Sequence, residues 1–308
     1  MAEHLKLRNP VTERPISDWS TVAVELLGSQ TRIVQGERWH HRVVEMGEGE
    51  PLFLYHGVGG HVETYARTLP QLAKHFRVFA VDALYHGYSS KEPWDTDNHT
   101  LRQAEAYVDL LHALGYERAH YEGESMGAVI GLEIGMSFPD TVNKIVLNGG
   151  FDVVQTKRTE WQKQPFKGNL GELSRAAVLD PSYENIHKRL LWLVHDDSTI
   201  TDEMIRIRQR LYQDPEINAS MRRVFGLGDD VRRNFGGPYT EEDLKSRWRT
   251  PALVMYGTYN PGTGPDHGEY CADLIGAKFY EVKDTGHWPQ WEKPDEYTEA
   301  LLSFLTED

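Results

Sequence analysis

Cysteine is almost absent from this chain, whose 308 residues include a single one, Cys271. A disulfide within one molecule is therefore excluded, and a reducing, cytoplasmic setting is the expected location. Cys271 lies in a predicted helix with no base beside it in the sequence, so we interpret it as a packing residue. The N-terminus has no apolar stretch typical of a signal peptide, and no apolar run approaches the length of a transmembrane helix.

Positive charge is scarce relative to negative charge, with 33 Lys and Arg residues against 47 Asp and Glu residues and a net charge of −14. Such a surface repels phosphate backbones and anionic membranes, so we expect neither nucleic acid nor a membrane as a partner. A small-molecule substrate is the expected partner, and a homo-oligomer is left open. The hydrophobic share of 39% is enough for a packed core.

Apolar runs of strand length alternate with helical patterns along most of the chain. The stretch 101–116 places its apolar residues on one helix face, and 126–138 is a helix of small residues that ends at Pro139. This alternation predicts an α/β fold in which a mostly parallel central sheet has helices on both faces. The expected strands cover 51–57, 76–83, 119–125, 142–150, 251–258 and 277–287.

The alternation is interrupted between about 155 and 245, where the sequence is charged and helical in pattern. Because this stretch is too long for a loop, we predict an inserted helical lid over 155–245. The rest of the chain then divides into a polar N-terminal arm at 1–20 and a core made of 21–154 and 246–308.

The pentapeptide GESMG at 123–127 matches the nucleophile elbow G-x-S-x-G, with an apolar strand before it and a small-residue helix after it. A strand that turns this sharply into a helix strains the backbone at Ser125 and leaves no room for bulky side chains at Gly123 and Gly127. The turn places the Ser125 hydroxyl at a helix N-terminus, where free amides favour negative charge. We predict that Ser125 is a nucleophile.

A glycine loop, HGVGG at 56–60, follows an earlier strand. Such loops supply an oxyanion-hole amide, and we predict the N–H of Val58 as one donor and the N–H of Met126 as the second, with Gly57 beside the substrate. An ordinary glycine turn is the alternative. The order and spacing of the loop ahead of Ser125 favour the oxyanion hole.

The sequence DTGHW at 284–288 follows the last expected strand and places His287 where a general base is needed. The order of Ser125, then an acid region, then His287 is that of α/β-hydrolases. The other histidines lack the spacing of metal ligands, so we expect neither a metal nor another cofactor.

The acid that should orient this histidine is missing from its expected place. After the apolar run 253–256 and Gly257, that place holds Asn260. A neutral amide accepts a hydrogen bond from the imidazole but does not stabilise the imidazolium as a carboxylate does. We predict that Asn260 keeps the positional role. Asp152, just beyond the sixth-strand stretch, is predicted to supply negative charge if any residue does, and Asp266 is the other nearby carboxylate.

Two stretches, GHWPQWEKPDEY at 286–297 and the lid segment 181–216, are similar to those of the meta-cleavage-product hydrolases. These are carbon–carbon bond hydrolases of aromatic degradation within the α/β-hydrolase fold, and the resemblance extends over most of residues 50–305. It implies that Trp288 contacts the substrate and that Arg208 holds the substrate's carboxylate. It also implies the reaction, covalent hydrolysis through Ser125 of a 2-hydroxy-6-oxo-dienoate.

Several positions depart from that family's pattern. Glu124 stands where the family usually has Asn, Ala128 where it has a second glycine, and Asn260 where it has the acid; the loop at 56–60 lacks its proline. Glu124 either faces the pocket, where a carboxylate repels an anionic substrate, or points to solvent. Two other functions stay open: a carboxylesterase or lactonase with the same machinery, and a non-enzymatic small-ligand receptor on a hydrolase fold.

Overall fold

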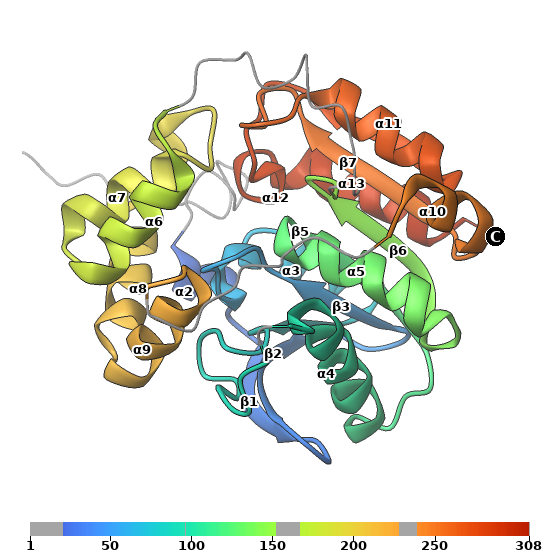
Figure 1. The fold of residues 1–308 in the computed structure, drawn as a ribbon, viewed down its shortest axis with the longest axis horizontal. Coiled ribbons are helices and arrows are strands. Elements are labelled where there is room, and N and C mark those ends of the chain that lie inside the picture. The colour runs from blue at the N-terminus through green and yellow to red at the C-terminus, as the bar shows by residue number, and fades with distance from the viewer. Residues whose placement is uncertain (1–20, 96, 152–166, 228–238, 308) are drawn as a thin grey trace, which may run out of the picture.

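The computed structural model describes residues 21–95, 97–151, 167–227 and 239–307. Its centre is one eight-stranded sheet in the order β1-β2-β4-β3-β5-β6-β7-β8 (Figure 1). β2 pairs antiparallel with β1 and with β4, and all other neighbours pair in parallel. The strands are β1 (Gln30–Gln35), β2 (His40–Met46), β3 (Pro51–Tyr55), β4 (Arg77–Val81), β5 (Ala119–Glu124), β6 (Val142–Asn148), β7 (Ala252–Gly257) and β8 (Lys278–Val282).

The central strands are buried on both faces, as their long apolar runs predict. In β3, Phe53 and Tyr55 enter one hydrophobic cluster while Leu52 and Leu54 enter another, because side chains alternate along a strand. The parallel register pairs Tyr55 with Gly123 near the carboxyl ends of β3 and β5. The loops that follow these two strands therefore emerge side by side.

Helices cover both faces of the sheet, and the predicted α/β architecture is confirmed. One layer contains α4 (His99–Ala113), α5 (Met126–Ser137) and α11 (Pro265–Ile275), and the other contains α3 (Leu69–Leu72) and α13 (Pro294–Leu305). Shorter helices of the core are α2 (Val22–Glu25), η2 (Val62–Tyr65), η3 (Pro139–Thr141), α10 (Glu241–Arg247) and α12 (Pro289–Glu292).

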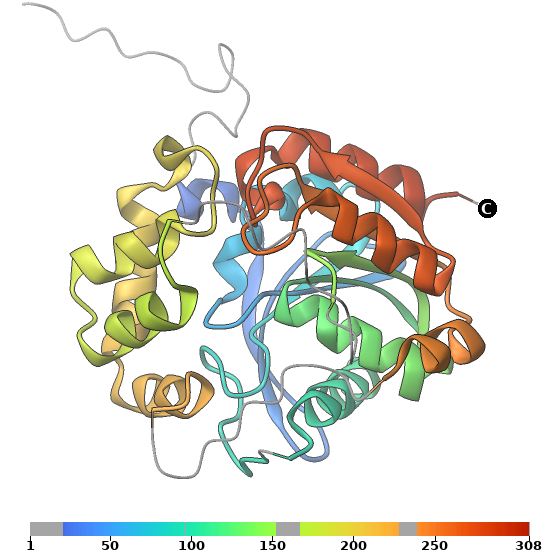
Figure 2. The ribbon, with the colours of Figure 1, turned by 45° about the horizontal axis from the view of Figure 1, so that its top comes forward.

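A group of helices lies to one side of this core and forms the lid (Figures 1 and 2). Side-chain caps fix where these helices begin; the hydroxyl of Thr201, for example, accepts a hydrogen bond from the N–H of Met204. Their buried faces form a separate hydrophobic cluster together with Trp288 and Trp291 of the core. The lid elements are α6 (Leu170–Leu179), α7 (Tyr183–Leu191), η5 (Asp197–Thr199), α8 (Asp202–Gln213) and α9 (Pro215–Val224).

Hydrogen bonds join the lid to two loops of the core. The hydroxyl of Tyr212 in α8 donates to the carbonyl of Gly59 at 3.0 Å. The carbonyl of Leu193, just after α7, accepts from the N–H groups of His287 at 2.7 Å and Trp288 at 3.0 Å. The lid therefore contacts both the predicted oxyanion loop and the predicted histidine loop.

The predicted arm at 1–20 and the predicted start of the lid at 155 lie outside the described residues. Residue 245 falls within α10, which packs against α11. Among the helices of the described residues, none combines the length and the apolar character that crossing a membrane requires.

Candidate active site

Ser125 lies in the sharp turn between β5 and α5. Its backbone has φ +55° and ψ −109°, a left-handed conformation that residues other than glycine rarely adopt. The N–H of Ser125 donates to the carbonyl of Asn148 at 2.7 Å, which ties the turn to the end of β6. This is the strained strand-to-helix geometry that the GESMG motif predicts.

The two glycines of the motif are required by close backbone contacts. A Cβ atom at Gly123 would lie 2.2 Å from the carbonyl carbon of Gly127, and a Cβ atom at Gly127 would lie 2.1 Å from the carbonyl oxygen of Tyr55. Any larger residue at either position would collide with backbone. The turn therefore needs glycine on both sides of Ser125.

The loop after β3 brings Gly57 and Val58 beside Ser125. Both residues line the same pocket as Ser125, while Met126, the first residue of α5, is buried next to it. Within the described part of the chain, no hydrogen bond uses the N–H of Val58 or of Met126. The two predicted oxyanion donors thus lie near Ser125, and their N–H groups are uncommitted among the described residues.

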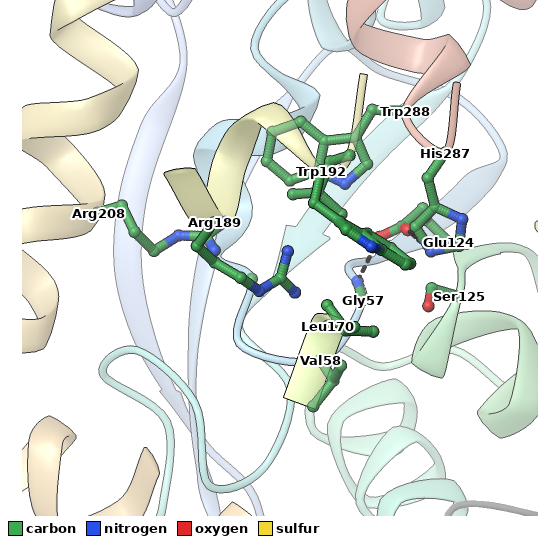
Figure 3. Close-up of a pocket in the computed structure, with 12 residues that line it drawn as sticks. Gly57, Val58, Glu124, Ser125, Leu170, Arg189, Trp192, Arg208, His287 and Trp288 are labelled. Carbon is green, nitrogen blue, oxygen red and sulfur yellow. Dashed lines mark hydrogen bonds and ion pairs between the residues drawn. The ribbon is translucent and has the colours of Figure 1, made fainter. Parts of the chain in front are cut away.

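His287 comes from the loop after β8 and reaches the same pocket (Figure 3). A Cβ atom at Gly149 would lie 3.2 Å from Cε1 of His287 and 3.7 Å from the backbone nitrogen of Ser125, so both residues lie against this glycine. On the lid side, the edge of the ring meets Trp192, whose ring centre is 5.7 Å away. The structure brings Ser125 and His287 together, as predicted.

Asn260 lies beside the other edge of the histidine ring. Its Oδ1 is 2.5 Å from Nδ1 of His287, and its Nδ2 donates to the carbonyl of Thr263 at 2.8 Å. The second hydrogen bond fixes the amide so that oxygen faces the ring. Asp266 is exposed in the first turn of α11, and Asp152 lies outside the described residues.

Glu124 is buried and faces the pocket, which decides between the two orientations open to it. Only 2% of the residue is exposed. Its Oε2 accepts a hydrogen bond from the N–H of Gly57 at 2.7 Å, and its Oε1 lies 3.1 Å from Nε2 of His287. The second contact is at ion-pair distance, but its angles are not those of a hydrogen bond, so Oε1 has no hydrogen-bond partner among the described residues.

Burial shifts the pKa values of Glu124 and His287 in opposite directions, because it disfavours the charged form of each group. It raises the pKa of Glu124 to about 8. The N–H of Gly57 lowers this pKa, and the neighbouring Glu122 raises it. Burial, with the charge of Arg189, lowers the pKa of His287 to about 3. At neutral pH the carboxyl group is therefore protonated and the imidazole is neutral.

The pocket that Ser125, Glu124 and His287 share is small, and residues of the lid line one side of it. Its volume is about 20 Å³, room for about one water molecule. Arg208 and Trp288, the residues that the resemblance connects to substrate, both line it. The guanidinium carbon of Arg208 lies 5.7 Å from the ring centre of Trp288.

A sequence model of the alpha/beta hydrolase fold family matches residues 50–294. The chain belongs to this family. Two relatives are the 2-hydroxy-6-oxo-6-phenylhexa-2,4-dienoate hydrolase of Comamonas testosteroni and a 2-hydroxy-6-oxononadienedioate/2-hydroxy-6-oxononatrienedioate hydrolase of Paraburkholderia phymatum. The first is 28% identical over 85% of this chain and 89% of that protein, and the second is 29% identical over 87% and 91%.

A solved structure, that of a serine hydrolase involved in carbazole degradation, superposes with a TM-score of 0.74. It is 25% identical and covers 90% of this chain and 99% of that one. The chain is thus an α/β-hydrolase that resembles the meta-cleavage-product hydrolases, as the sequence predicts.

Several residues that line the pocket of this hydrolase were not predicted, and Arg189 is the charged one among them. Arg189 in α7 is 2% exposed, donates from Nε to the hydroxyl of Ser174 at 2.9 Å, and keeps Nη1 without a partner among the described residues. Its guanidinium projects toward Gly57 and Val58 (Figure 3). Helical spacing is the signal that could have found it, because Arg189 lies three residues after the buried Ile186 on the apolar face of α7.

Proposed function

We propose that this protein is a serine hydrolase that cleaves a carbon–carbon bond in a 2-hydroxy-6-oxo-dienoate, the class of compound after which its relatives are named. The observation that carries the proposal is a pair of buried guanidinium groups, Arg189 and Arg208, in the same pocket as Ser125 and His287. Neither arginine forms an ion pair among the described residues; such buried cations favour an anionic ligand, and a neutral ester supplies no such charge.

The two arginines have donors to spare. Arg208 is 1% exposed, and its Nε and Nη2 have no hydrogen-bond partner among the described residues. Glu124 is the one acid among the described residues that line the pocket, so the two guanidinium groups leave an excess of positive charge whether Glu124 is protonated or ionised. We infer that Arg208 pairs with the substrate carboxylate and that Arg189 provides a second cationic contact, with Trp288 packing against the bound dienoate.

The proposed reaction begins with the keto tautomer of the substrate. Nε2 of His287 takes the proton from the Ser125 hydroxyl while the serine oxygen attacks the carbonyl carbon C6. Negative charge develops on the carbonyl oxygen, where the N–H groups of Val58 and Met126 stabilise it.

The bond between C5 and C6 then breaks. Its electron pair leaves on C5, where conjugation with the 2-oxo acid spreads the charge, and the proton held by His287 moves to this carbon. Water next attacks the acyl ester on Ser125, with His287 as the base, and releases the second acid.

Substrate entry requires movement of the lid. Leu170, Arg189, Trp192 and Arg208 all project from the lid into the pocket, whose present volume of about 20 Å³ holds no substrate of this class. Opening of the lid before binding and closure over the bound dienoate follow from this, and closure excludes water from the bond-breaking step.

Turnover of a yellow dienoate ring-fission product, compared with that of a nitrophenyl ester, tests the proposal. Fast bleaching of the dienoate with slow ester cleavage is the expected result. The reverse order would assign a carboxylesterase or lactonase, and binding of the dienoate without turnover of either compound would assign a ligand receptor.

A further inference from the structure

The two edges of the His287 ring have unequal partners. A neutral amide, that of Asn260, faces Nδ1 at 2.5 Å, where hydrolases of this fold place a carboxylate. A carboxyl group, that of Glu124, faces Nε2 at 3.1 Å, on the side from which the base receives the serine proton. The acidic group of this site therefore lies on the opposite edge of the ring from the usual one.

The hydrogen bonds around the ring locate one proton. Because Oδ1 of Asn260 only accepts, Nδ1 of His287 carries a hydrogen and Nε2 of the neutral ring carries a lone pair. Oε2 of Glu124 already accepts from the N–H of Gly57, so a protonated Glu124 carries its hydrogen on Oε1. That oxygen lies 3.1 Å from Nε2, at angles that are not those of a hydrogen bond. In the protonated state the carboxyl group therefore lies beside Nε2 without a charge.

We propose that Glu124 is a positioning residue for His287: its carboxylate supplies, at the Nε2 edge, the negative charge that Asn260 lacks, and its protonated form leaves the imidazolium without that charge and so weakens the base. The inference rests on the proposed function only in that His287 acts as the base.

The proton balance of the step is simple. When Glu124 is ionised, Nε2 accepts the proton from the Ser125 hydroxyl as the serine oxygen attacks, and the imidazolium that forms has Nε2 3.1 Å from the charged Oε1. The charge on Glu124 stabilises this imidazolium until the proton passes to the leaving group. No proton is gained or lost by Glu124 during the cycle.

The groups around Glu124 set the pH at which it ionises. Burial and the negative charge of Glu122 oppose ionisation of Glu124. The positive charges of Arg189 and Arg208 favour it. Activity should therefore rise by about tenfold per pH unit below the pKa of Glu124, which burial raises to about 8, and level off above it. The charged and titratable groups that act on Glu124 are Tyr65, Glu122, Arg189, Arg208, His287 and Tyr297.

A double-mutant cycle between Glu124 and Asn260 tests the inference. Glu124→Gln should lower kcat by about 10²–10⁴-fold and remove the rising pH limb. Asn260→Asp, which moves a carboxylate to the Nδ1 edge, should raise kcat in the Glu124→Gln background and lower it in the wild-type background, where two carboxylates would keep the ring protonated. If Glu124 had only a structural role, Asn260→Asp would change kcat in the same direction in both backgrounds.

The matched control is Glu133→Gln. Glu133 is a buried glutamate in α5 that accepts from the hydroxyl of Tyr239 and lies outside the pocket. This control should keep the wild-type pH profile. Thermal melts of all variants verify that each one is folded.

A second readout needs no substrate, so failure of the inference is distinguishable from failure of the proposed function. The ¹⁵N shifts of the His287 imidazole should change near pH 8 in the wild-type protein and should lose this inflection in Glu124→Gln. An unchanged inflection, a wild-type pH profile in Glu124→Gln, or an Asn260→Asp effect of the same sign in both backgrounds would overturn the inference. If the inflection behaves as expected but no dienoate is cleaved, the proposed function fails and this inference stands.

Discussion

Oδ1 of Asn260 accepts a hydrogen bond from Nδ1 of His287 at 2.5 Å, and the carbonyl of Thr263 holds the amide in that orientation. The contact fixes the tautomer of the ring without giving it a charge. In most triads one carboxylate both orients the histidine and supplies negative charge. Here Asn260 orients the ring, and the proposed source of charge is a different side chain, Glu124.

Asn260→Ala should therefore damage both stability and catalysis. The substitution leaves the Nδ1–H of a largely buried ring without an acceptor, which costs about 1–3 kcal/mol of the free energy of unfolding. It should also lower kcat, because the ring loses its orientation. Urea denaturation and steady-state kinetics measure the two effects. Asn98→Ala is the control, since Asn98 is exposed and makes no side-chain cap bond; equal behaviour of the two variants would contradict the role of Asn260.

Replacement of the pocket arginines by methionine should weaken substrate binding. Arg208→Met should cost on the order of 2–5 kcal/mol of transition-state binding, read from kcat/KM, because it removes the partner of a buried carboxylate. Arg189→Met should show a smaller loss in the same direction. Both variants should remain folded, since methionine keeps most of the side-chain volume and removes a buried charge.

Arg206 supplies the matched control for these two variants. It lies in the same helix as Arg208, is exposed, and pairs with Asp202 across one helical turn at 2.6 Å. Arg206→Met should leave kcat/KM near the wild-type value. Small and equal effects at all three arginines would show that the pocket does not bind an anion.

Glu122 should make the protein less stable as the pH rises. This buried carboxyl accepts from the hydroxyl of Tyr297 at 2.5 Å, and burial raises its pKa to about 7. The pKa of Glu122 is higher in the folded state than in the unfolded state. At pH values between these two pKa values, the folded state therefore binds more protons than the unfolded state. The stabilising contribution of Glu122 is complete below about pH 4.5 and is lost as the pH rises to about 7.

Glu122→Gln removes this ionisation while keeping an oxygen acceptor for Tyr297. Relative to wild type, the variant should gain on the order of 3 kcal/mol between pH 4.5 and pH 8. Free energies of unfolding from urea titrations at several pH values measure the difference. A constant offset between the two proteins at all pH values would show that Glu122 does not ionise over this range.

Much of the fold followed from patterns with a direct physical cause. The alternation of apolar runs and helical stretches predicted the parallel sheet, and the glycines around Ser125 predicted the sharp turn, because backbone contacts near 2 Å leave no room for a Cβ atom at either one. The antiparallel placement of β2 between β1 and β4 did not follow, since register and partner depend on contacts far apart in the sequence.

Site residues were predictable where their distance along the chain from the end of a strand sets their position, as for His287 and Asn260. They were not predictable where their role depends on the direction in which the side chain points. Glu124 and Glu122 alternate with Tyr121 and Gly123 along β5, so both acids enter the interior, yet the sequence alone left Glu124 between pocket and solvent. The proposed charge of Asp152 remains a prediction, because that residue lies outside the described part of the chain.

The most direct test of the account follows the yellow absorbance of a dienoate ring-fission product in a single turnover with the wild-type protein and with Ser125→Ala. The wild-type protein should bleach the dienoate. The variant should bind it and leave the colour unchanged, or bleach it slower by several orders of magnitude, since removal of a nucleophile eliminates the covalent step. A folded Ser125→Ala variant that bleaches the dienoate at the wild-type rate, or a wild-type protein that leaves it intact, would contradict the proposal that this hydrolase uses Ser125 to cleave a carbon–carbon bond.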